Sequence, residues 1–364
     1  MKKFFLCFLV FFPNIVCAFP EMVRYGYFNC TSCHVSPTGE GILTPYGRSL
    51  SREILSTWGK ETEPEFAYDM LSLPPWMNLT GKYRSVYMYR DTPRVREGRY
   101  ILMQLDLEGA LNYKGLGLVG VLGRKATTKA DTWQDHIFSR RHYINFRPSD
   151  EVSLRLGKFH HAFGINVPDH IIPTKRALGW DQGEETYNFE AALLKEQVGA
   201  HVTAVSGNPN VGKAEREKGL AVTATIFLWD RLKPGVSYFW GDKKDQRRHV
   251  FGPYGILGFT PSFFLLTELD FQFLKPQTEK EQKGLVNYQR LDYEWVQGFH
   301  TYVTQEMSRL DFKNKKARSD AYGFGLQFFP RPHFEFNLLW QKQRTLSISP
   351  EYFDFAWLMF NFYL

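Results

Sequence analysis

The chain has 364 residues, of which 43% are hydrophobic and 16% aromatic, and its formal net charge is +7 at pH 7. No run of 18 or more apolar residues follows the first 18 positions, which excludes a membrane-spanning helix in the rest of the chain. Its basic residues do not gather into one block interleaved with aromatic residues, so we expect no nucleic-acid partner. The mean hydropathy of −0.35 still allows a membrane β-barrel, because its strands alternate lipid-facing with lumen-facing residues.

The first residues, MKKFFLCFLVFFPNIVCAFPEM, have the pattern of a secretory signal. Two lysines precede an apolar run, and Val16 and Ala18 occupy the small positions before a cleavage site. We therefore predict a signal peptide over residues 1–18 and export of the rest of the chain. Cleavage there removes Cys7 and Cys17 from the four cysteines. A lipid anchor on Cys17 is the alternative, although the residues before it make a poor lipoprotein cleavage box.

The stretch YFNCTSCHVSPTGEG, residues 27–41, carries a CxxCH motif at Cys30, Cys33 and His34. A dithiol redox centre would place such a pair in a βαβ unit, whereas residues rich in Pro and Gly follow here. A zinc site would normally need a second ligand pair, and no other cysteine remains after cleavage. In CxxCH, both sulfurs bond covalently to haem and the histidine binds its iron. We therefore predict one covalent haem c; a structural disulfide beside an incidental histidine is the alternative.

The haem-attachment segment is predicted to cover residues 19–78. One short helix is predicted over 49–59, with Ser49 as its N-cap, and a second between Pro64 and Met70. Such a segment is too short and too poor in helix to bury a porphyrin alone. We therefore expect it to act as a plug that takes the walls of its haem pocket from the rest of the chain.

Two arginines flank the CxxCH motif and could contact the haem carboxylates. Arg24 precedes the motif and Arg48 follows it. A guanidinium group pairs well with a carboxylate, and haem carries two of them. The alternative for each arginine is a solvated position on the surface.

From residue 79 onward, apolar and polar residues alternate in short segments separated by turn signals. In QLDLEGALN, Gln104, Asp106 and Glu108 lie on one face of a strand, and Leu105 and Leu107 on the other. LTELDFQFLK and HFEFNLLWQ alternate in the same way. We count about sixteen such segments, and each has about the ten residues that a tilted membrane strand needs.

A soluble sandwich or barrel would alternate as well, but three features favour a membrane barrel. The strands are numerous and show no break between domains. Their polar faces carry full charges, which a dry core would not tolerate and a wet lumen would. The last segment, DFAWLMFNFYL, places Leu358, Phe360 and Phe362 on one face, as is typical of outer-membrane barrels. We predict an all-β fold, a transmembrane antiparallel β-barrel of about 16 strands over residues 79–364.

The alternation lapses in GKFHHAFGINVPDHIIPTKRALGWDQG, residues 157–183. This stretch is either a loop folded into the lumen over the haem or an ordinary exposed or constriction loop. In the first case Lys175 and Arg176 would face the haem carboxylates. The candidates for the sixth ligand of the haem iron are Met70, His160, His161 and His170, and Met22 is a further thioether in the haem segment.

The combination of an export signal, one CxxCH near the mature N-terminus and a barrel to the C-terminus resembles the fused monohaem cytochrome–porins of bacterial outer membranes. The resemblance is architectural over the whole chain, and its motif support is Cys30, Cys33 and His34. That family is associated with iron oxidation and extracellular electron transfer. The resemblance implies an electron-transfer cytochrome of the outer membrane rather than a conventional enzyme, with ferrous-ion oxidation as one activity.

The leading hypothesis is therefore an outer-membrane protein whose single haem passes electrons between an extracellular donor or acceptor and periplasmic carriers. A metal ion outside the cell is one such donor, and the lipid bilayer is the other expected partner. The alternative is a small-solute diffusion porin with a structural disulfide or haem at its N-terminus. A third hypothesis is haem-based sensing, which would need an open or weakly held sixth site on the iron.

Overall fold

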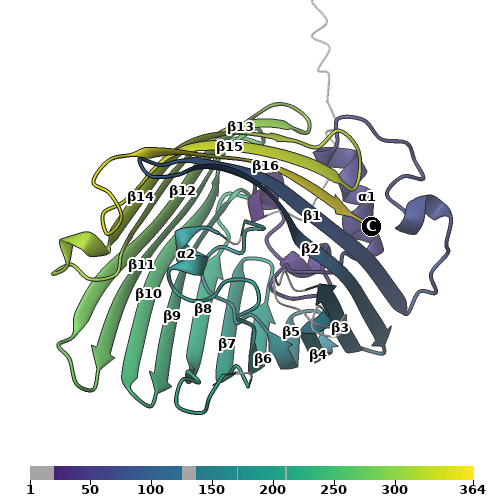
Figure 1. Cartoon of the computed structure of the whole chain (residues 1–364). Coiled ribbons are helices and arrows are strands. Elements are labelled where there is room, and N and C mark those ends of the chain that lie inside the picture. Colours follow the sequence, from purple (N-terminus) through teal and green to yellow (C-terminus); the bar gives the residue numbers. More distant parts are fainter. Residues whose placement is uncertain (1–19, 125–136, 170, 210) are drawn as a thin grey trace, which may run out of the picture.

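A computed structural model describes residues 20–124, 137–169, 171–209 and 211–364. The predicted signal peptide, 1–18, and His170 lie outside these ranges. Within them, sixteen antiparallel strands close into a barrel in which β1 pairs with β16 (Figure 1). The strands are β1 Met77–Asp91, β2 Arg96–Tyr113, β3 Leu116–Arg124, β4 Ile137–Ser149, β5 Val152–Phe159, β6 Thr186–Leu194, β7 Val198–Gly207, β8 Lys218–Ile226, β9 Leu232–Lys243, β10 Gln246–Gly258, β11 Phe263–Pro276, β12 Gln282–Val296, β13 Phe299–Arg309, β14 Arg318–Phe328, β15 Phe334–Thr345 and β16 Phe353–Tyr363. The predicted barrel and its strand number are confirmed.

The strands send apolar side chains outward and polar side chains into the lumen. In β2, Leu107 is 60% exposed, whereas the neighbouring Glu108 is 0% exposed. In β3, Leu116 and Leu118 are exposed and Val119 is buried. A water-soluble surface does not carry an apolar belt of this kind, so the outer face contacts lipid. The barrel therefore spans a bilayer.

The two ends of the barrel differ in the length of their connections. At one end, which we call the turn end, the connections are two to five residues long, such as 114–115 and 297–298. At the opposite end, which we call the loop end, β5 is joined to β6 through residues 160–185. Bacterial outer-membrane barrels show the same asymmetry, with short periplasmic turns and longer external loops.

Residues 20–76, which we call the plug segment, precede the first strand. Its helical turns are η1 Pro20–Tyr25, η2 Cys30–Ser32, α1 Pro45–Leu50, the π-helical turn η3 Ser51–Leu55 and η4 Phe66–Asp69. The helix predicted over 49–59 in fact begins earlier, because Thr44 Oγ1 accepts a hydrogen bond from Gly47 N (3.0 Å) and caps it. Ser49, the predicted cap, instead donates to Tyr46 O (2.8 Å) inside the helix. The second predicted helix is reduced to the turn η4. None of the helices in the described ranges is long and apolar enough to cross a membrane.

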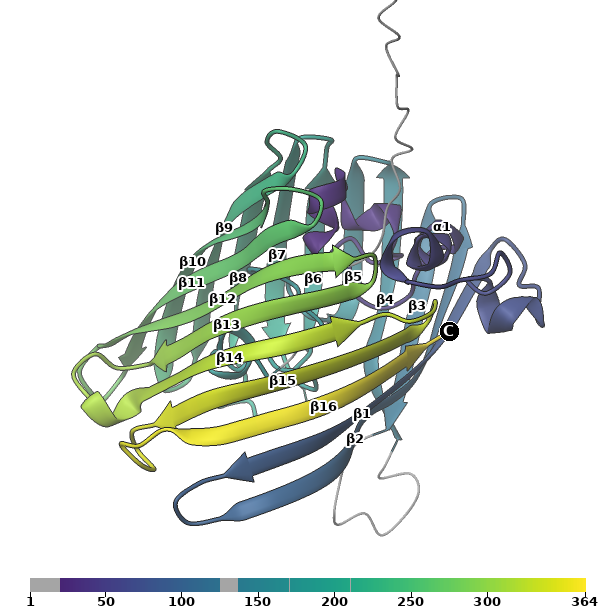
Figure 2. The same ribbon diagram turned by 90° about the horizontal axis from the view of Figure 1, so that it is seen from above.

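The plug segment is attached to the turn end of the barrel. Asn29 Nδ2 donates to Leu194 O (3.1 Å), beside the connection from β6 to β7. Thr57 Oγ1 donates to Gln297 O (2.8 Å), in the connection from β12 to β13. Figure 2 shows the first turns of the segment within the ring of strands. The segment therefore occupies the lumen near the turn end.

Residues 160–185, which we call the inward loop, leave β5 and fold into the lumen (Figure 1). Gly164 N donates to Ser237 Oγ (2.9 Å) on β9, and Ile165 N donates to Glu268 Oε2 (2.9 Å) on β11. The short helix α2, Pro173–Arg176, packs against β11, β12 and β13 from inside. The structure therefore excludes an exposed loop, whereas both a loop over the haem and a constriction loop agree with a position inside the barrel.

Candidate functional site

A cavity of about 310 Å³ lies inside the barrel where the plug segment faces the inward loop, and we call it the central cavity. Cys30, Cys33 and His34 line it from the plug segment, and His160 and His161 line it from the inward loop. Strands β1, β2, β4, β16 and β6 to β10 supply the remaining walls. Its volume lies at the lower end of the range for ligand pockets, roughly 300–1,000 Å³. The fold therefore brings the CxxCH motif to a cavity inside the barrel.

The CxxCH motif forms a single helical turn. Cys33 N and His34 N both donate to Cys30 O, at 3.2 and 2.9 Å, and His34 then forms a β-bridge with Leu43. The chain between them folds back over the motif at Gly39, whose φ is +75°. A Cβ at Gly39 would lie 2.9 Å from Cys30 Sγ, so a larger residue has no room there. This tight return places all three motif side chains on one wall of the central cavity.

The two cysteines are free thiols in this structure. Burial, and to a smaller extent the neighbouring Cys30, raises the pKa of the Cys33 thiol to about 12. Cys33 is therefore a poor nucleophile, because the thiolate is the reactive form. Within the described residues, no group of three or more His, Cys, Asp or Glu side chains is placed to hold a bare metal ion. The strands of the described sheet are antiparallel, so the motif also lacks the βαβ setting of a dithiol redox centre.

The remaining walls of the central cavity suit a haem group. Haem offers a flat apolar ring, an iron atom and two carboxylates, and attaches through two thiols and an imidazole. The apolar side chains that line the cavity include Val23, Phe28, Leu43, Phe163, Ile165, Trp180 and Ile256. Cations line it as well. The donor set and the wall chemistry together fit a covalently attached haem.

Three of these cations form no ion pair with any described residue: Arg84 on β1, Lys233 on β9 and Lys175 of the inward loop, whose Nζ donates to the backbone oxygen of Phe163 (3.3 Å). Arg84 Nη1 donates to the backbone oxygen of Pro168 (3.0 Å), and its buried Nε has no partner in the described ranges. Lys233 Nζ donates to the backbone oxygen of Phe28 (2.9 Å). Arg84 is buried and the two lysines are half-buried, and a cation that has lost water without gaining a counter-ion is costly. Each is therefore suited to an anionic group in the cavity.

Arg24 and Arg48, the two arginines predicted to contact the haem carboxylates, lie outside the central cavity. Arg24 is 1% exposed, and its Nη1 lies 2.7 Å from Glu294 Oε2 on β12. Arg48 is buried on α1, and neither arginine lines the central cavity. Their closeness to the motif in sequence is misleading, because η1 packs against β10 and turns Arg24 toward the barrel wall. Of the loop cations predicted to face the carboxylates, Lys175 lines the cavity and Arg176 does not.

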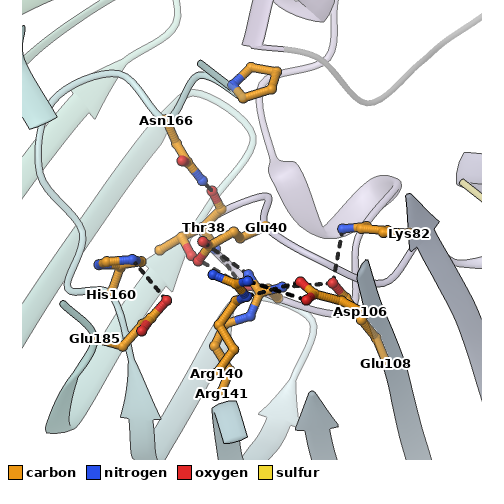
Figure 3. A network of polar contacts seen from close by, with 12 residues as sticks. Thr38, Glu40, Lys82, Asp106, Glu108, Arg140, Arg141, His160, Asn166 and Glu185 are labelled. Atoms are coloured by element: carbon orange, nitrogen blue, oxygen red, sulfur yellow. Dashed lines mark hydrogen bonds and ion pairs between the residues drawn. The ribbon is translucent and has the colours of Figure 1, made fainter. Parts of the chain in front are cut away.

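The candidates for a sixth iron ligand are separated by the fold. Met70 is 76% exposed and does not line the central cavity. His160 and His161 both line it, as do Met22 and His201. Figure 3 shows His160 directed at Glu185, with Nε2 3.4 Å from Oε1. Burial, with smaller contributions from neighbouring cations, lowers the pKa of His161 to about 3, so its imidazole is neutral at pH 7.

A network of charged side chains, shown in Figure 3, attaches the plug segment to the barrel wall. Arg141 on β4 contacts both Glu40 of the plug segment (2.9 Å) and Glu108 on β2 (3.0 Å). Lys82 on β1 reaches the same Glu108 (3.1 Å). Burial alone would raise the pKa of Glu40, but Arg141 above all holds it at about 2. Glu40 is therefore a carboxylate at any physiological pH, and its attraction to Arg141 joins the plug segment to the wall.

The same region also joins the plug segment to the inward loop. Asn166 Nδ2 donates to Thr38 O (2.9 Å), as Figure 3 shows. Arg155 on β5 donates to Ser36 Oγ (3.0 Å) and pairs with Glu190 (2.8 Å). The sequence pattern places the strand residues on the lumen face, but it contains no signal for these particular partners. The central cavity is thus held together by contacts between three distant parts of the chain.

No protein-family model matches this sequence, and no curated protein sequence matches it. Solved structures of similar fold do exist. OmpT of Vibrio cholerae lacking loop L8, an outer membrane protein, is 8% identical with a TM-score of 0.62, and the match covers 79% of this chain and 99% of that one. Salmonella typhi OmpF, in complex with daunomycin, is 9% identical with a TM-score of 0.59 and coverages of 79% and 97%. The outer membrane channel DcaP of Acinetobacter baumannii is 10% identical with a TM-score of 0.55 and the same coverages. At such low identity the likeness establishes the fold alone, a porin-like antiparallel barrel.

Proposed function

We propose that this chain is an outer-membrane electron-transfer protein that carries one covalent haem c in the central cavity of a porin-like barrel. One observation carries the proposal. Cys30, Cys33 and His34 together line a largely apolar cavity inside the barrel that also contains cations without ion pairs. Alternative uses of a CxxC pair do not need such a cavity.

In this proposal, Cys30 and Cys33 form the two thioether bonds and His34 binds the iron. Arg84 and Lys233 are the candidates for the carboxylates, since each donates a hydrogen bond to a backbone oxygen and pairs with no described carboxylate. The bound haem supplies reversible one-electron transfer at its iron. The protein supplies orientation through the short return at Gly39, and it excludes water with the apolar side chains of the plug segment and the inward loop.

The position of the central cavity suits exchange between two compartments. The turn end, where the plug segment is attached, corresponds to the periplasmic side of bacterial outer-membrane barrels. A periplasmic electron carrier docks there, and an extracellular donor or acceptor, including a metal ion, approaches from the loop end. The hydrocarbon layer is about 30 Å thick, so one redox group serves both sides only if a partner comes close to it. Export through a cleaved signal peptide over residues 1–18 is part of the same proposal.

Diffusion of small solutes is the second candidate function. The similarity in fold to the DcaP channel and to OmpF favours it. In that case the cysteines, or a haem attached to them, support the structure of the plug segment only. The plug segment and the inward loop both occupy the lumen, so an open pore would be narrower than the barrel itself.

The deciding experiment is an absorption spectrum of the protein purified from outer membranes of a host that attaches haem c. We expect a haem band that persists after acid–acetone extraction, together with a mass increase of one haem on the denatured chain. A colourless protein of unmodified mass would eliminate the electron-transfer proposal. For a coloured protein, liposomes that enclose an electron acceptor separate the two functions. Reduction from outside supports electron transfer, whereas solute conductance without electron flow supports the porin.

A further inference from the structure

Two histidine-bearing segments from separate parts of the chain line the central cavity. His34 lies on the plug segment, whereas His160 and His161 lie on the inward loop, which folds in after β5. The two axial ligands of a haem iron lie on opposite faces of the ring. A second protein ligand must therefore come from a wall other than the one that carries Cys30, Cys33 and His34.

Outside the motif itself, four described side chains of the central cavity carry an imidazole or a thioether: Met22, His160, His161 and His201. Met22 packs in one cluster with Cys33, so it belongs to the wall that already carries the motif. The Nε2 atom of His160 lies 3.4 Å from Glu185, a residue that is 1% exposed. His201 Nδ1 lies 3.6 Å from Glu190. Each of these two imidazoles already faces a buried carboxylate.

His161 differs from His160 and His201 in that it forms no ion pair with a described carboxylate. Its Nε2 atom, like Nδ1 of His201, is buried and has no hydrogen-bond partner in the described part of the chain. Its ring is held between aromatic side chains, with centroids 5.0 Å from Trp180 and 5.2 Å from Phe239. A buried imidazole nitrogen without a partner is costly, and coordination to a metal would satisfy it. The aromatic contacts also fix the ring plane in advance, as a good metal ligand requires.

We propose that His161 Nε2 is the second axial ligand of the haem iron, opposite His34. This inference rests on the proposed function. It predicts a six-coordinate, low-spin iron with two histidine ligands that does not readily bind carbon monoxide. It also means that the iron would connect the plug segment to the inward loop, adding a bond between two segments that already share the contact from Asn166 to Thr38.

The test compares His161→Ala with the matched control His160→Gln, both in the full-length protein purified with its haem. Electron paramagnetic resonance of the oxidised protein should show loss of the low-spin signal in His161→Ala and its retention in His160→Gln. The reduced His161→Ala protein should bind carbon monoxide, and added imidazole should restore the low-spin signal. Retained resistance to unfolding in detergent gels shows that each variant barrel is folded.

The outcomes separate this inference from the proposed function. A haem-bearing wild type whose His161→Ala variant stays low-spin overturns the assignment but leaves electron transfer standing. A histidine–methionine signature in the unmodified protein also overturns it, and this measurement needs no variant. A low-spin signal lost only in His160→Gln would assign the ligand to the neighbouring residue. A wild type without haem would overturn both the assignment and the proposed function.

Discussion

The barrel wall and the segments inside its lumen are determined by different kinds of interaction. In the wall, a residue's position follows from its neighbours along the strand: Leu107 faces lipid and Glu108 faces the lumen because side chains alternate. Inside the lumen, a residue's position depends on partners far away in sequence, as in the contact between Asn166 and Thr38. The orientation of a wall residue is therefore set by the alternation along its own strand. The position of a lumen residue is set by contacts between segments that are distant in sequence.

This difference implies that the site and the barrel can be disrupted separately. The strand pairs around the barrel include β1 with β16, and they do not use the plug segment. The central cavity, in contrast, needs the plug segment, the inward loop and the wall together. Changes in the lumen should therefore remove function while the barrel stays folded, whereas changes on the lipid face should destabilise the barrel and the cavity with it.

The largest expected effect comes from replacing both cysteines, in Cys30→Ala/Cys33→Ala. We expect complete loss of covalent haem, because both thioether bonds are removed. The barrel should still fold, since neither residue takes part in strand pairing. Haem content after acid–acetone extraction and resistance of the barrel to unfolding in detergent gels measure the two results. If haem remained covalently attached, the site would lie elsewhere in the chain.

On the wall, Leu107→Arg should destabilise the barrel by about 2–4 kcal/mol, the cost of a cation near the middle of the lipid-facing surface. Leu107 is exposed near the centre of β2. The conservative Leu107→Ile is the matched control, with an expected change of less than about 1 kcal/mol. Equilibrium refolding into lipid vesicles in urea measures both. An unaffected Leu107→Arg barrel would contradict the lipid-facing assignment of β2.

The fold could be predicted from sequence because the strands of the wall follow the same alternation of apolar and polar residues. Alternation in QLDLEGALN and in segments like it gave the strands, their faces and the approximate strand number. Short-range sequence signals failed at the start of the first helix, where two residues could act as the N-cap. Ser49 looked like a helix cap, yet Thr44 caps a helix that starts at Pro45, because proline there suits the first helical position.

The site could be predicted only in part. Cys30, Cys33 and His34 were found because their chemistry is fixed by a spacing of four residues, and the fold gathers them at one cavity. Arg84 and Lys233 carry no such signal, since one cation on the lumen face of a strand looks like any other. Arg24 was chosen for its proximity in sequence, but its partner Glu294 lies on β12, 270 positions away. Pairings of this kind depend on the closed barrel.

A moderate effect is expected from Glu40→Gln, which removes the charge that joins the plug segment to Arg141. Burial alone would raise the pKa of Glu40, but the charges of Arg141, His160 and Arg155 outweigh it and lower the pKa from 4.5 to about 2. A pKa lowered on folding stabilises the folded state above the unfolded value. This contribution, roughly 3 kcal/mol, is lost as the pH falls from about 4.5 to about 2.

Limited proteolysis of the plug segment across that pH range measures the effect. We expect the wild-type segment to become protease-sensitive as the pH falls, and the Glu40→Gln segment to be more sensitive already at pH 7, with a flatter dependence on pH. Glu61→Gln is the matched control, because Glu61 is exposed on the same segment. Equal pH profiles for wild type and Glu40→Gln would show that other groups hold the plug segment in place.

The smallest effect is expected from Asn166→Ala, which removes the side-chain hydrogen bond from the inward loop to Thr38 O (2.9 Å). A single hydrogen bond of this kind contributes about 1 kcal/mol, so the barrel and its haem content should be unchanged. The inward loop should nevertheless detach from the plug segment more often, since this contact bridges the two directly. Single-channel recordings in planar bilayers would then show brief openings of higher conductance than the wild type. If instead the traces of the two proteins were identical, the inward loop would be held by its wall contacts, Gly164 to Ser237 and Ile165 to Glu268, and not by the plug segment.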